Sequence, residues 1–91
     1  MKIIFSRHAE DRIKERGATK EEIFKTIKEG EQLPVKEGRV AYKKNFQYNK
    51  KWKGKYYTTK QVIVITKKEG DNLIVITVFT FYIGGKNEDK I

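Results

Sequence analysis

The stretch QVIVITKKEGDNLIVITVFTFYI, residues 61–83, holds two runs rich in valine, isoleucine and phenylalanine. Such β-branched and aromatic side chains favour strands. Glu69-Gly70-Asp71-Asn72 between the runs suits a tight turn, so the stretch predicts an antiparallel hairpin. The second run, Leu73 to Ile83, is apolar on both faces, which predicts an interior strand. This longest apolar run is shorter than the ~20 residues that a membrane helix needs.

The segment before this hairpin begins with a short apolar run, residues 2–5, which predicts a strand. A helix is predicted over residues 7–16. Ser6 is a suitable N-cap for it, and Gly17 is placed to end it.

A second helix is predicted directly afterwards. Thr19-Lys20-Glu21-Glu22 matches a capping box, because Glu22 follows Thr19 by three residues. We expect this helix to bury Ile23, Phe24 and Ile27 and to end at Gly30.

The middle of the chain predicts further strands. Pro34 indicates a connection or an edge strand, residues 40–48 alternate as a half-buried strand does, and residues 49–54 are predicted to form a polar loop. The resulting order, β-α-α-β-β-β(β), predicts an α+β fold with two helices on one face of a mainly antiparallel sheet of four or five strands. Residues 1–85 form the single expected domain, and residues 86–91 a flexible tail.

The composition limits the chemistry. The chain has 91 residues, no cysteine and one histidine. It therefore has no disulfide framework, thiol nucleophile, cysteine-based zinc site or histidine cluster, and we expect no metal and no cofactor. These features predict a small soluble domain of the cytoplasm without a membrane segment.

The net charge of +9 is unevenly distributed. Residues 39–68 contain ten lysines and arginines and no acid, and aromatic residues alternate with them. Lysines neutralise phosphates, and aromatic rings stack on unpaired bases. The segment therefore favours a nucleic-acid-binding face over an ordinary lysine-rich surface. Its candidate contact residues are Lys43, Lys44, Lys50, Lys51, Trp52, Lys53, Lys55 and Lys60.

The first predicted helix carries a basic stripe. His8, Arg12 and Arg16 are spaced by four residues, so they share one side of the helix, next to the buried Ala9 and Ile13. A histidine exchanges protons near neutral pH, and arginines hold phosphate oxygens. The same spacings also suit an ordinary salt-bridged surface helix.

The motif Ser6-Arg7-His8-Ala9-Glu10-Asp11-Arg12-Ile13-Lys14-Glu15-Arg16-Gly17 resembles the opening of the family called domain of unknown function 4258. Ile74-Val75-Ile76-Thr77-Val78 resembles its closing strand. That family is similar to toxin-like, metal-independent ribonucleases, including the RelE, ParE-like and colicin-type groups. The resemblance implies a RelE-like fold with His8, Arg12, Arg16 and Thr77 as catalytic candidates.

A metal-independent endoribonuclease, the toxin of a toxin–antitoxin-type system, is the function that these features predict. His8 would perform one proton transfer and Arg12 would hold the phosphate. A sheet tyrosine or lysine, with Tyr42 and Tyr82 as candidates, would perform the second transfer or assist electrostatically. RNA is the expected partner, together with a small acidic antitoxin or immunity protein.

Two alternatives remain open at this point. One is an RNA-binding module without catalysis. The other is a ParE-like, protein-targeting toxin whose basic face binds an acidic partner.

Overall fold

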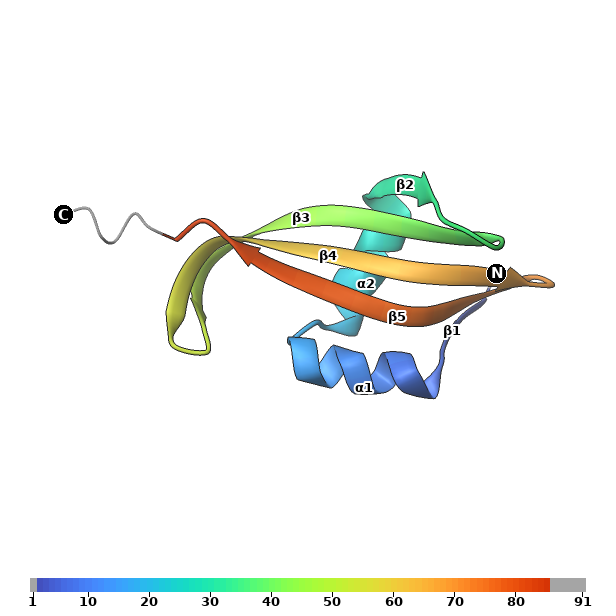
Figure 1. Ribbon diagram of the computed structural model, residues 1–91, viewed down its shortest axis with the longest axis horizontal. Helices are drawn as coiled ribbons and strands as arrows, with labels where there is room; N and C mark the ends of the chain where they lie inside the picture. The colour runs from blue at the N-terminus through green and yellow to red at the C-terminus, as the bar shows by residue number, and fades with distance from the viewer. Residues whose placement is uncertain (1, 86–91) are drawn as a thin grey trace.

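The computed structural model describes residues 2–85, which form two helices and one five-stranded sheet (Figure 1). The elements are β1 (Lys2–Phe5), α1 (Arg7–Arg16), α2 (Lys20–Glu29), β2 (Glu31–Pro34), β3 (Arg39–Trp52), β4 (Lys55–Glu69) and β5 (Asn72–Ile83). This order confirms the predicted α+β class. The expected tail, residues 86–91, lies outside the described residues.

The sheet is mixed, with the strand order β1-β5-β4-β3-β2. The predicted hairpin of β4 and β5 is confirmed, since the two strands are antiparallel with Glu69 opposite Asn72. β5 is an interior strand along Asn72–Val75, where it also pairs in parallel with β1. Pro34 ends β2, which is the edge strand beside β3. Among residues 2–85, no helix has the length and apolar character to cross a membrane.

The caps of both helices form as the sequence predicts. Ser6 accepts a hydrogen bond from the backbone N–H of Ala9 at 3.0 Å. Gly17 ends α1 in the left-handed conformation, at φ 74°, which a residue without Cβ adopts most readily. Thr19 and Glu22 make both hydrogen bonds of the capping box that starts α2.

The core lies between the two helices and one face of the sheet. Ala9 and Ile13 of α1 and Ile23 of α2 pack with buried valines of β4 and β5, namely Val62, Val64, Val75 and Val78. Full burial of each valine or isoleucine stabilises the fold by roughly 1.5–3 kcal/mol. The prediction of both helices on one face of the sheet is confirmed.

The prediction that Phe24 is buried in the core is wrong. Its side chain is 44% exposed, and it meets the ring of Phe5 edge-on at 5.9 Å. The buried side of α2 instead contains Ile23 and Thr26. Thr26 is tolerated there because its hydroxyl donates to the carbonyl of Glu22 at 2.7 Å.

The predicted loop at residues 49–54 is also wrong. β3 continues to Trp52, past a bulge between Gln47 and Lys50, and turns tightly at Lys53 and Gly54, which have positive φ. Residues 49–51 are Asn-Lys-Lys, so the sequence there lacks the apolar alternation of a sheet strand. We call residues 47–58 the hairpin tip; it bends away from the plane of the sheet (Figure 1).

Candidate nucleic-acid interface

α1 lies along an edge of β5 that has no partner strand. β1 pairs only with Asn72–Val75, so the following residues of β5 have no strand on that side. The hydroxyl of Ser6 donates to the carbonyl of Ile76 at 3.1 Å. At the other end of the helix, Arg16 Nη1 donates to the carbonyl of Val78 at 2.8 Å. α1 thus satisfies backbone groups that a further strand would otherwise bind.

Arg16 therefore has a structural role. Besides its bond to Val78, its guanidinium carbon lies 4.9 Å from the centre of the Phe79 ring. A phosphate would have to compete with both contacts. Arg16 anchors the end of α1, and it is the least available of the three stripe residues.

His8 and Arg12 are more accessible. The His8 side chain is exposed and makes no hydrogen bond or ion pair with the described residues. Arg12, with 28% of its side chain exposed, pairs with Glu15 at 2.8 Å. Because an exposed ion pair contributes at most about 1 kcal/mol, a phosphate can replace Glu15.

The stripe of His8, Arg12 and Arg16 lies on the side of α1 away from α2. Glu10 marks the opposite side, since it pairs with Lys20 at the start of α2. Arg16 marks the stripe's own side through its contact with β5. His8 lies about 12 Å from Arg16 along the helix axis, at 1.5 Å per residue. The stripe thus runs along the side of α1 away from α2, and Arg16 at its end is the member that contacts β5.

Thr77 lies in β5 between the two residues that α1 binds. It is opposite Ile65 of β4, beside a bulge. Its hydroxyl oxygen is buried and has no hydrogen-bond partner among the described residues. An unpaired buried hydroxyl costs about 1–3 kcal/mol. In this conformation a substrate has no access to that oxygen, so Thr77 is near the stripe in the fold but closed to solvent.

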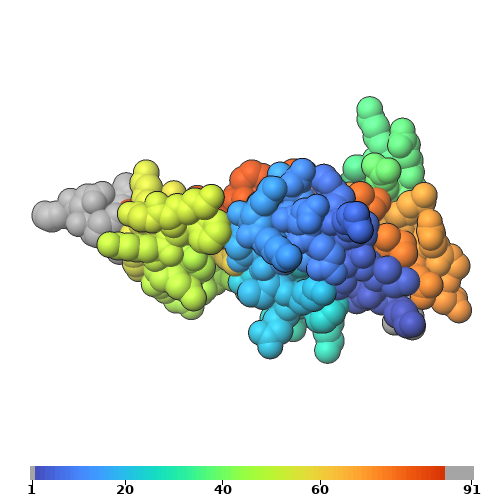
Figure 2. Space-filling view, turned by 90° about the horizontal axis from the view of Figure 1, so that it is seen from below, coloured from blue at the N-terminus to red at the C-terminus, as the bar shows by residue number. Residues whose placement is uncertain are grey.

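The hairpin tip, which carries four of the predicted lysines, lies beside the C-terminal end of α1. Lys50, Lys51, Lys53 and Lys55 are all exposed. The indole of Trp52 lies so close to Gly17 that a Cβ there would be 2.5 Å from the ring. Figure 2 shows the hairpin tip, in yellow-green, directly beside the end of α1. Trp52 is thus half-buried and holds the tip against the helix.

Lys43 and Lys44 lie elsewhere. They are neighbours in β3, so they point to opposite faces of the sheet. Lys43 pairs with Glu31 of β2 at 3.8 Å, and Lys44 pairs with Glu29 of α2 at 3.5 Å. β4 separates both of them from the edge that α1 follows. The fold therefore does not bring these two lysines to the stripe.

Lys60 was predicted to contact RNA, but its side chain is buried. It is only 3% exposed, and its ammonium donates to Glu22 Oε1 at 2.8 Å and to the carbonyl of Gly17 at 2.6 Å. A buried cation with these partners has no donor left in contact with solvent for RNA. The sequence did not indicate this pairing because Glu22 is 38 residues away along the chain.

Neither tyrosine candidate is placed for proton transfer at the stripe. Tyr82 donates its hydroxyl to the carbonyl of Arg16 at 2.8 Å. Burial raises the pKa of Tyr82 above its ordinary value of 10.0, so it stays neutral and bound near neutral pH. Tyr42 lies in β3, opposite Val64 of β4 and far from α1. Tyr82 and Thr80 instead bind the carbonyl of Arg16, the last residue of α1, and Lys60 binds that of Gly17 directly after it.

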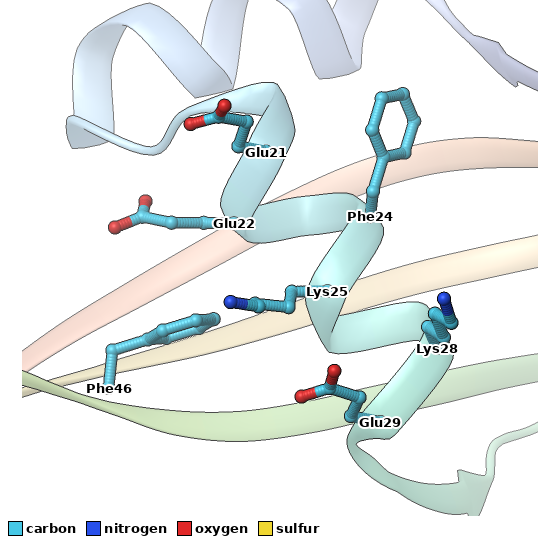
Figure 3. Close-up of a pocket in the computed structure, with 7 residues that line it drawn as sticks. All are labelled: Glu21, Glu22, Phe24, Lys25, Lys28, Glu29 and Phe46. Carbon is cyan, nitrogen blue, oxygen red and sulfur yellow. The ribbon is translucent and has the colours of Figure 1, made fainter.

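A groove of about 540 Å³ between α2 and β3 was not predicted from the sequence (Figure 3). Lys25 extends towards Phe46 across it, whereas Phe24 points away (Figure 3). It is lined by Glu21, Glu22, Phe24, Lys25, Lys28, Glu29 and Phe46. It contains none of the candidate residues. Within residues 2–85, no three histidine, aspartate or glutamate side chains gather in a metal-binding arrangement.

The fold and this site define a small α+β domain in which a helix with a basic stripe ends beside a lysine-rich hairpin. The chain belongs to the family described as domain of unknown function DUF4258, whose model matches residues 5–80. This match confirms the family resemblance and includes the whole stripe and Thr77. No curated protein and no solved structure matches the chain.

Proposed function

We propose that this protein is a toxin-like, metal-independent endoribonuclease that acts through His8 and Arg12. One observation supports the proposal: α1, whose exposed side holds both residues, ends beside the lysine-rich hairpin tip. An imidazole, a guanidinium and a cluster of ammonium groups along one path suit an RNA backbone. Its place of action would be the cytoplasm.

In the proposed reaction, the His8 imidazole accepts the proton of a ribose 2′-hydroxyl. The 2′-oxygen forms a bond to phosphorus while the bond from phosphorus to the 5′-oxygen breaks. Arg12 stabilises the negative charge that gathers on the phosphate oxygens. The leaving 5′-oxygen takes a proton from water or from the protonated His8, because Tyr82 and Lys60 are bound elsewhere. The products are a 2′,3′-cyclic phosphate and a 5′-hydroxyl.

The hairpin tip would supply affinity rather than chemistry. Lys50, Lys51, Lys53 and Lys55 are exposed, so each can release counterions from RNA on binding. Such contacts weaken steeply as the salt concentration rises. The same cations and the net charge of +9 would attract a small acidic antitoxin or immunity protein.

An RNA-binding module without catalysis is the second candidate. The surroundings of His8 favour this function, because none of the described residues donates or accepts a hydrogen bond that would fix the orientation of its ring. Catalytic histidines are commonly oriented by a second group. Arg16, already bound to Val78, also contributes less to a transition state than a free arginine would.

Cleavage of a structured RNA in the presence of EDTA tests the proposal. We expect the wild type to cleave, and His8→Ala and Arg12→Ala to lose at least 100-fold in rate, in line with the ~10²–10⁴ typical of a proton-transfer group. Lys14→Ala is the matched control, since Lys14 is an exposed cation of α1 outside the stripe. Salt-dependent binding without cleavage would support the second candidate. Full activity in both variants would exclude the α1 site.

A further inference from the structure

The face of the sheet opposite the helices is apolar and uncovered. We call it the outer face. Ile3 and Phe5 pack against the core, so Ile4 between them points to the outer face. In β4 and β5, alternate residues that pair across the two strands share the same outer face. The large apolar members are Ile4, Ile63, Ile65, Ile74, Phe79, Phe81 and Ile83.

Several of these side chains are well exposed. The exposed fractions are 38% for Ile4, 37% for Phe79, 48% for Phe81 and 47% for Ile83. In the view of Figure 1, α2 lies behind β4 and β5, and within residues 2–85 no element lies in front of them. A contiguous apolar surface of this kind commonly marks an interaction site.

Positive charge predominates around the outer face. Arg39 lies opposite Lys67, and Lys43 lies opposite Ile63, so all three cations share the outer face. Arg16 reaches the ring of Phe79 at the edge of β5. Among the described residues, the outer face also carries Lys2 and two carboxylates, Glu31 and Glu69. This distribution is complementary to an apolar ridge with acidic flanks.

The geometry of the sheet favours a helical partner. The backbone groups of β4 are already paired with β3 and β5, so a partner on the outer face must satisfy its own backbone hydrogen bonds. An extended segment would have to add to an edge instead. On one side, the edge consists of the four-residue β1 and, beyond Val75, of β5 with α1 beside it. On the other side, it begins with the short β2, which ends at Pro34 and pairs only with Val40–Lys43.

We propose that the outer face binds an acidic amphipathic helix of a partner protein. The apolar side of that helix would run along β5 over Ile74, Phe79 and Phe81, and its acidic residues at the Ile74 end would meet Lys67 and Arg39. A second copy of this chain is a poorer occupant, because two such faces would bring their excess cations together. The proposal does not depend on RNA cleavage.

The probe is a synthetic helical peptide with leucines on one side and glutamates on the other. A counterpart has lysines in place of the glutamates. Titration by fluorescence anisotropy should show saturable binding of the acidic peptide, and at least tenfold weaker binding of the basic one. Equal binding of both peptides, or none of the acidic one, would overturn the proposal.

Variants locate the binding. Phe81→Ser should weaken it at least tenfold, whereas Phe24→Ser, which alters a similarly exposed phenylalanine on α2, should change it less than twofold. Lys67→Glu should weaken it several-fold, and Lys25→Glu, an exposed lysine of α2 on the helix side of the sheet, should not. Equal loss in Phe24→Ser and Phe81→Ser would overturn the assignment to the outer face.

Two further measurements distinguish the outer face from the hairpin tip and a helical partner from a second copy of the chain. An acidic peptide could bind the hairpin tip instead, so a variant with Lys50, Lys51, Lys53 and Lys55 changed to glutamine must keep the affinity. Sedimentation equilibrium should show a monomer without peptide. Loss of binding in the tip variant, or a stable dimer that Phe81→Ser dissociates, would contradict a helical partner on this face.

Discussion

Trp52 stacks on Tyr82, with ring centres 4.9 Å apart and planes inclined by 13°. This contact joins the turn end of β3 to the last part of β5. Tyr48 and Tyr57 surround the same ring of Tyr82 at 5.4 and 5.5 Å. Because the hydroxyl of Tyr82 also binds the carbonyl of Arg16, one aromatic cluster holds the hairpin tip, β5 and the end of α1 together.

Trp52→Ala should release the hairpin tip. Losing a half-buried indole should lower the free energy of unfolding by about 2 kcal/mol, below the cost of a fully buried tryptophan. RNA affinity should also fall, because the tip lysines lose their position beside α1. Trp52→Phe should restore most of both properties. Urea denaturation and a binding titration measure the effects, and unchanged RNA affinity in Trp52→Ala would contradict the anchoring role.

Gly17→Ala should be more harmful than Gly38→Ala. Both glycines have positive φ, at 74° and 71°, so both substitutions incur about 1–2 kcal/mol of backbone strain. Gly38 has open space around it, whereas a Cβ on Gly17 would meet Trp52 and the hydroxyl of Tyr82. This clash should add about 1–3 kcal/mol in denaturation experiments. Equal costs would show that the indole does not lie over Gly17 in solution.

Lys60→Met should destabilise the fold without a direct effect on RNA contacts. The substitution leaves the Glu22 carboxylate and the carbonyl of Gly17 without their partner. Removing one partner of a buried pair costs about 3–5 kcal/mol. Lys20→Met, which breaks the exposed pair with Glu10, should cost less than about 1 kcal/mol. A stable Lys60→Met protein with weakened RNA binding would restore Lys60 to the binding surface.

Tyr82 should make the stability depend on pH in the alkaline range. Burial raises the pKa of Tyr82 in the folded state above the value of 10.0 that it has when unfolded. The unfolded chain therefore loses this proton first, so the stabilisation is complete below pH 10.0 and is lost as the pH rises through the folded pKa. Tyr82→Phe should remove this loss from urea denaturation curves, whereas Tyr56→Phe, in the exposed hairpin tip, should keep it. Identical pH dependence in both variants would contradict the burial of Tyr82.

Much of the fold could be predicted because its signals are local. The caps at Ser6 and Thr19 and the turn at Glu69–Asn72 each lie within a few residues, and all three form. The predicted burial of Phe24 was wrong because helical spacing shows which residues share a side of the helix but not how far the covering sheet extends. The predicted loop at residues 49–54 was wrong because Asn49, Lys50 and Lys51 interrupt the apolar alternation, and the packing of Trp52 on Tyr82 depends on a distant strand.

The site was harder to predict, because its organisation depends on contacts between distant parts of the chain. The basic stripe on α1 follows from helical periodicity alone. In contrast, Lys60 and Tyr82 resemble surface and strand residues until Glu22 and the end of α1 are placed beside them. The uneven charge of residues 39–68 identified the lysines but not their separation into the hairpin tip, the paired Lys43 and Lys44, and the buried Lys60.

We propose that the α1 stripe and the hairpin tip form one RNA surface. The chain has one histidine, so the His8 imidazole gives a single, assignable set of NMR signals. In a titration with an oligonucleotide whose 2′-hydroxyls are replaced by hydrogen, we predict that these signals shift together with the amides of Lys50–Lys55. The shifts at His8 should weaken when the tip lysines are changed to glutamine. Saturable RNA binding that leaves the His8 signals unmoved would show that the α1 stripe is not part of the RNA surface.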